Sequence, residues 1–214
     1  MNICFLDGVD IPYTSNDLDS NKIRGAETVL INLSQELFKL GNKVTVYNNY
    51  NNNKNINGIK WSNFKNVDKN VIFDLAITNN DINLFKKIKS KKYIAISHSI
   101  QSIEKFIRKK QLFSYLKNKP KIILIGKYHK EKRNIITRIW GHDFLNLAID
   151  NNFLKSEVNI DINDLSNQAI FTSRPDRNGE KLIKIWKEKI IPHRNNIKLL
   201  ITPTSEMIDY RKIN

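Results

Sequence analysis

Short apolar runs alternate along the chain with stretches in which apolar residues recur every three or four positions. The short runs are typical of buried strands, and the periodic stretches are typical of helices that bury one face. The predicted strands of the first part are 2–6, 43–47, 59–64, 71–77, 93–96 and 121–125. The predicted helices are 25–40, 81–89, 100–117 and a short one after Gly126. This alternation predicts an α/β fold with a Rossmann-like, doubly wound parallel sheet.

The same pattern restarts near the end of the chain. A predicted strand at 169–173, a helix at 180–189 and a strand at 197–201 form one βαβ unit. A single unit of this size buries too little apolar surface to fold alone, so we expect the sequence to be truncated. The predicted organisation is a first Rossmann-like domain at 1–154, a linker at 155–168 and an incomplete second Rossmann-like domain at 169–214.

The formal net charge of +15 points to anionic partners, although a composition rich in Lys, Asn and Ile explains part of it. No zinc-finger, RNP or heptad pattern is present, which argues against nucleic acid as the partner. The chain also has no apolar run of about 20 residues that could span a bilayer. With one cysteine, Cys4, it cannot form an internal disulfide, and this favours a cytoplasmic protein. The asparagine-rich segment 48–57 is predicted to be a loop.

The first candidate site is the start of the helix at 25–40. It consists of Arg24, Gly25, Ala26 and Glu27. Gly25 allows a ligand to approach the backbone, and the amides of a helix start favour an anion. The alternative is an ordinary helix start in which Glu27 only matches the helix dipole. The spacing is not the Gly-x-Gly-x-x-Gly pattern of dinucleotide binding, which argues against NAD.

Two further candidates also lie where a strand ends. His98 follows the strand at 93–96, where it could orient a hydroxyl group or transfer a proton. The alternative is a structural histidine, with Ser99 capping the next helix. Arg174 and Arg177 lie between the strand at 169–173 and the next helix, where they could clamp a diphosphate, or simply face solvent.

The fourth candidate is the basic run 104–121, in which Arg108, Lys109 and Lys110 are interleaved with apolar and aromatic residues. As one amphipathic helix, it would suit an anionic lipid surface. The alternative is a helix that packs on the core and leaves its basic face in solvent.

Together these segments resemble the group 1 (family-four) glycosyltransferases over almost the whole chain. The run from Arg24 to Leu33 resembles the Gly-Gly-Ala-Glu helix start of that family. His98 falls where the family ends a strand with a histidine near the donor sugar. The segment 169–179 resembles the opening of the family's second domain, where basic residues hold the donor diphosphate, and Arg174 and Arg177 match it. The family's Glu-x7-Glu motif, which binds the donor, is missing because the chain stops first.

The resemblance implies a GT-B glycosyltransferase that moves a sugar from a nucleotide-sugar donor to a glycan or lipid-linked acceptor. It implies retention of configuration and no cofactor or bound metal. The enzyme would be cytoplasmic or peripheral at the inner face of the membrane, and inactive as this fragment. No carboxylate pair of the glycosidase type is evident. The alternative is a basic α/β protein without catalysis that binds nucleic acid or a membrane surface.

Overall fold

The computed structural model describes residues 1–18, 23–100, 102–131, 136–146, 148, 167–172 and 178–201. The chain divides into two compact units, Met1–Ala148 and Ile149–Asn214, and each is described by itself. The predicted domain boundary at residue 154 and most of the predicted linker 155–168 lie outside the described residues.

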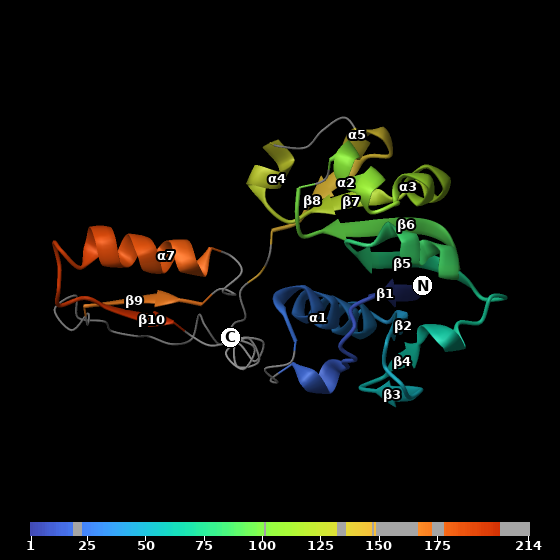
Figure 1. Ribbon diagram of the computed structural model, residues 1–214. Helices are drawn as coiled ribbons and strands as arrows, with labels where there is room; N and C mark the ends of the chain where they lie inside the picture. Colours follow the sequence, from blue (N-terminus) through green and yellow to red (C-terminus); the bar gives the residue numbers. More distant parts are fainter. Residues whose placement is uncertain are drawn as a thin grey trace. The chain divides into compact units, whose positions relative to one another are not determined.

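The first unit is built on an eight-stranded sheet with the order β3-β4-β2-β1-β5-β6-β7-β8 (Figure 1). Its strands are β1 Asn2–Leu6, β2 Lys43–Asn48, β3 Lys54–Ile56, β4 Ile59–Asn63, β5 Ile72–Asn79, β6 Lys89–Ser97, β7 Lys121–Leu124 and β8 His142–Phe144. Every pair is parallel except β3 with β4. The predicted α/β fold with a mostly parallel sheet is confirmed. The order of the six strands from β4 to β7 is consistent with a Rossmann-like fold.

The two faces of the sheet pack against different helices. Alternate residues of β1 point to opposite faces, so Ile3 and Phe5 join one core while Cys4 and Leu6 join the other. The first core contains Leu30 of helix α1 (Gly25–Lys39). The second is covered by the 3-10 helix η3 (Ile82–Lys87) and by α2 (Ile103–Arg108) and α3 (Leu112–Asn118). Strands buried on both faces explain the continuous apolar runs in the sequence.

The predicted helix at 100–117 is wrong as one element. Lys110, between α2 and α3, has a left-handed backbone with a φ of 53°, which breaks the helix. After the break, the side-chain Nε2 of Gln111 donates to Oδ1 of Asp81 at 2.9 Å. The hydroxyl of Ser114 donates to Oδ1 of Asn83 at 2.8 Å. These contacts attach α3 to the η3 segment as a helix separate from α2, so a continuous basic amphipathic helix does not form.

Three smaller predictions also differ from the structure. The predicted helix at 81–89 is the shorter η3, and β6 already begins at Lys89 because it pairs with β5 from Ile72 onward. Part of the predicted loop 48–57 forms β3, which turns into β4 through Asn57 and Gly58, both with positive φ. Strand β8 was not predicted. Helices α4 (Lys127–Glu131) and α5 (Ile136–Ile139) lie between β7 and β8.

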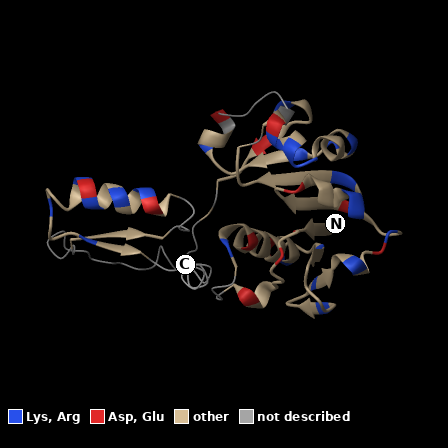
Figure 2. Cartoon of the chain, viewed as in Figure 1, with Lys and Arg blue, Asp and Glu red and all other residues tan. Residues whose placement is uncertain are grey.

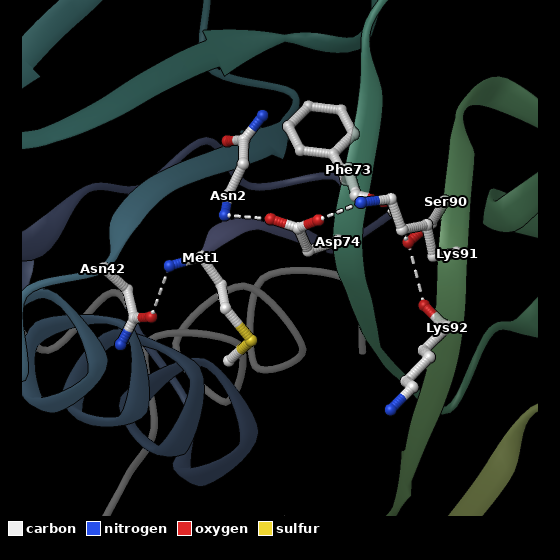
Figure 3. A network of polar contacts seen from close by, with 8 residues as sticks. All are labelled: Met1, Asn2, Asn42, Phe73, Asp74, Ser90, Lys91 and Lys92. Atoms are coloured by element: carbon white, nitrogen blue, oxygen red, sulfur yellow. Dashed lines mark hydrogen bonds and ion pairs between the residues drawn. The ribbon is translucent and has the colours of Figure 1, made fainter.

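A polar network joins three strands at the amino-terminal edge of the sheet (Figure 3). The amide of Asn2 in β1 donates to Oδ2 of Asp74 in β5 at 2.8 Å. The Nζ of Lys91 in β6 donates to Oδ1 of the same carboxylate at 2.7 Å. The amide of Asn2 and the ammonium of Lys91 lower the pKa of Asp74. This edge is held by structural contacts and lies opposite the carboxyl ends of the strands.

The second unit contains the βαβ pattern that the sequence predicted. Strands β9 (Gln168–Phe171) and β10 (Lys198–Ile201) are parallel, and α7 (Gly179–Ile185) lies between them in the chain. A π-helical stretch, Trp186–Ile190, follows α7.

Candidate functional site

Three polar side chains lie at the carboxyl ends of neighbouring strands. Asp7 follows β1, Asn79 ends β5 and His98 follows β6. Because these strands are parallel and adjacent, their carboxyl ends meet at one edge of the sheet. The chain continues from β1 to β2 on one side, whereas β5 lies on the other side of β1, which makes this a topological switch point. Ligands of open α/β sheets bind at such points, so this edge is the candidate site.

Asn79 connects two of the predicted site segments. Its Nδ2 donates to the carbonyl oxygen of Ala26, at the start of α1, at 3.0 Å. Its Oδ1 lies 3.3 Å from Nε2 of His98. Asn79 is buried, with 6% of its surface exposed. Residues that are far apart in the sequence, Ala26 and His98, are therefore held in one place by a single amide side chain.

This contact also fixes which nitrogen of His98 carries the hydrogen. Because the side-chain nitrogen of Asn79 donates to the Ala26 carbonyl, the Asn79 atom that faces His98 is the oxygen, which can only accept a hydrogen bond. In the neutral ring, Nε2 is then the donor and Nδ1 is the acceptor. Partial burial lowers the pKa of His98 and the charge of His129 lowers it further, against an opposing effect of Glu27. The ring is therefore mainly neutral at pH 7.

Two carboxylates are buried at the same edge, Asp7 and Glu27, each with 6% of its surface exposed. The hydroxyl of Tyr13 donates to Oδ2 of Asp7 at 2.7 Å, and the amide of Val9 donates to Oδ1 at 3.3 Å. Burial raises the pKa of Asp7 to about 6, and the charge of Glu27 adds to this rise, whereas the hydrogen bond from Tyr13 opposes it. This pair is not evident in the sequence, because the two residues belong to different segments of the chain.

The predicted phosphate-binding segment has a more specific arrangement than the sequence indicated. Oε2 of Glu27 accepts the backbone amide of Arg24 at 3.0 Å, so this carboxylate caps its own helix and cannot coordinate an anion. Arg24 and Gly25 are exposed. A side chain at position 25 would meet no atom of the described residues within 4 Å of its Cβ, so the space beside the Gly25 backbone is open to a ligand. A small hollow beside the helix start is lined by Val9, Ile11, Tyr13, Ile23, Arg24 and Glu27.

His129 adds a second imidazole near the site. It lies on α4, which follows β7, and its charge acts on the pKa of His98. Its Nδ1 is buried and has no hydrogen-bond partner in the part of the chain that the structure describes. Asp7, Asn79 and His129 can be identified from the sequence by the same signal as His98, since each lies at or soon after the end of an apolar strand run.

The remaining predicted site residues have different outcomes. Arg174 and Arg177 lie outside the described residues. Arg108, Lys109 and Lys110 are exposed at the end of α2 and in the turn after it. The suggested cap at Ser99 is wrong, because the Oγ of Ser102 accepts the amide of Lys105 and caps α2.

Within the described ranges, no group of three or more His, Cys, Asp or Glu side chains is arranged to hold a metal ion. None of the described helices is long and apolar enough to cross a bilayer. A scan of the chain against protein-family models and a search of curated proteins both found no match.

Proposed function

We propose that this chain is a glycosyltransferase that transfers a sugar from a nucleotide-sugar donor to a glycan or lipid-linked acceptor. The proposal depends mainly on one observation. Asn79 hydrogen-bonds to the start of α1 through Ala26 and contacts the ring of His98. These are the two first-domain segments that carry the resemblance to the GT-B family, and they meet at a switch point of a parallel sheet.

Each residue then has a role that its chemistry allows. The open backbone of Gly25, at the positive end of α1, would hold a phosphate of the donor. Glu27 would keep the first turn of the helix in place through the amide of Arg24. His98 would contact the donor sugar, with Nδ1 accepting a hydrogen bond from a sugar hydroxyl. Arg174 and Arg177 would neutralise charge on the leaving diphosphate.

The neutral state of His98 supports this role. A neutral imidazole whose Nε2 is occupied by Asn79 offers one acceptor in a fixed direction. An imidazolium would instead have two donors and no acceptor, and would bind the diphosphate as a cation. Burial therefore favours contact with the sugar over contact with phosphate at this position.

Thermal unfolding in the presence of UDP-, GDP- and ADP-sugars tests the proposal. A nucleotide-sugar at about 100 times its Kd stabilises the folded state by about 2.7 kcal/mol, which raises the Tm by several degrees. We expect this for at least one nucleotide-sugar. Replacing His98 with Ala should weaken binding of the nucleotide-sugar about tenfold and leave binding of the free nucleotide unchanged.

His142→Ala is the matched control, because this histidine begins β8 and therefore lies at the opposite, amino-terminal edge of the sheet. It should bind as the unchanged protein does. If no nucleotide-sugar shifts the Tm at millimolar concentration, the proposal is wrong. It is also wrong if His98→Ala weakens free nucleotide and nucleotide-sugar equally, since His98 would then not contact the sugar.

A further inference from the structure

Helices α2 and α3 expose large apolar side chains to solvent. The exposed fractions are 40% for Ile103, 59% for Ile107, 68% for Phe113 and 47% for Leu116. Each pair recurs at helical spacing, four residues apart in α2 and three residues apart in α3. Single exposed apolar residues are common, but four in two short helices that pack against each other are more than a surface without a partner usually shows.

The same helices are firmly attached to the domain. Phe106 of α2 and Tyr115 of α3 are fully buried, and their rings lie 5.0 Å apart. The bonds from Gln111 to Asp81 and from Ser114 to Asn83 fix α3 on the η3 segment. The exposed side chains therefore belong to a rigid surface and not to a loop that could fold over them.

Three consecutive cations lie between the two apolar pairs. Arg108 ends α2, and Lys109 and Lys110 form the turn before α3, where the left-handed backbone of Lys110 reverses the chain. All three are exposed, and none takes part in an ion pair within the described parts of the chain. Figure 2 shows Lys and Arg along α2 and α3.

The cations of this turn repel one another. Partial burial, and then the charges of Lys109 and Arg108, lower the pKa of Lys105 to about 8. Its Nζ donates to the hydroxyl of Ser99, a neutral group that does not balance the charge. An anionic partner would relieve this repulsion, and the exposed apolar side chains restrict which anionic partner fits.

We infer that the α2–α3 pair is a docking surface for an anionic phospholipid membrane. Ile107 and Phe113 would enter the boundary between headgroups and acyl chains, while Arg108, Lys109 and Lys110 would bind lipid phosphates. The surface differs from the continuous amphipathic helix that the sequence predicted, because two short helices and a cationic turn form it. This inference does not depend on the proposed transfer activity.

A second basic surface shows why lipid fits better than another polyanion. Five lysines surround a groove at 64–89, namely Lys65, Lys69, Lys86, Lys87 and Lys89. The apolar residues there are at least partly covered: Ile88 is buried, Phe64 and Val67 are partly buried, and the Nζ of Lys87 lies 5.2 Å from the centre of the Phe64 ring. Binding to a nucleic acid requires only cationic side chains such as these lysines. Binding to a membrane is also strengthened by exposed apolar side chains, which the α2–α3 pair has.

Co-sedimentation with vesicles tests the inference. We expect the chain to bind vesicles of phosphatidylglycerol and phosphatidylcholine, and to bind phosphatidylcholine alone at least tenfold more weakly. Replacing Arg108, Lys109 and Lys110 together with Gln should reduce partitioning to the anionic vesicles roughly a hundredfold, which is about fivefold for each cation removed. Phe113→Ser should reduce it roughly tenfold with all charges kept.

The matched control replaces three groove lysines, Lys65, Lys69 and Lys86, with Gln. It removes the same charge and should keep at least a third of the binding. Circular dichroism and the Tm verify that each variant folds, and Phe113 is exposed enough for its replacement to be tolerated. The inference is overturned if the control loses as much binding as the α2–α3 variant, or if Phe113→Ser binds normally. It is also overturned if single-stranded DNA binds more tightly than anionic vesicles at the same salt and competes for the same cations.

Discussion

Asp7 is expected to make the domain less stable as the pH rises. Its carboxyl is buried beside Glu27, and burial raises its pKa from 3.8 to about 6. In the unfolded chain the group releases its proton near pH 3.8, but in the folded chain it holds the proton until about pH 6. The folded state therefore binds more protons between these values, and the free energy of unfolding falls as the pH rises through this range. A shift of about two pKa units corresponds to a loss of about 3 kcal/mol above pH 6.

The substitution Asp7→Asn removes this charge without changing the shape of the side chain. The new amide oxygen can keep the hydrogen bond from Tyr13 or from Val9, but its NH2 group cannot accept the other. Losing one hydrogen bond costs about 1 kcal/mol. We therefore expect the variant to be about 2 kcal/mol more stable than the unchanged protein at pH 8, and equal or slightly less stable at pH 4.

Urea unfolding followed by circular dichroism at several pH values between 4 and 8 measures this difference. Asp10→Asn is the matched control, because Asp10 is an exposed aspartate three residues further along the chain. It should leave the pH dependence unchanged. A destabilised Asp7→Asn variant at pH 8, or a difference that is the same at pH 4 and pH 8, would refute the reasoning. The charged carboxylate of Asp7 would then be stabilised by its hydrogen bonds more than burial penalises it.

The connecting role of Asn79 and the inaccessibility of Cys4 provide two further tests. Asn79→Ala removes the donor to Ala26 and leaves that carbonyl without this partner, so urea unfolding should show a loss of about 2 kcal/mol in the free energy of unfolding. Asn70 is exposed, so the control Asn70→Ala should lose less than about 0.5 kcal/mol. Equal losses in the two variants would show that the Asn79 amide does not stabilise the fold. Cys4 is fully buried, and burial raises the pKa of its thiol. A thiol reagent should therefore label it only as fast as the domain unfolds, and much faster in urea. Rapid labelling without urea would show that β1 is not enclosed.

The sequence predicted most of the elements, because their signals are local. The apolar runs of β1, β2 and β7 and the periodic face of α1 occur within single segments. Gly41 ends α1 with a φ of 81°, the conformation that glycine adopts without strain. His98 was identified in the same way, since its position depends only on where its own strand ends.

The sequence by itself thus determined most of the strands and helices, the burial of Cys4 and its neighbours, and the position of His98 after a strand. Only the tertiary structure decided the break between α2 and α3, the strand order and the meeting of Asn79 with Ala26 and His98. The physical reason is that each of these depends on contacts between residues far apart in the chain, and no local pattern encodes such a contact. Asp7 and Glu27 influence each other for the same reason, because the fold brings β1 and the start of α1 to one edge of the sheet.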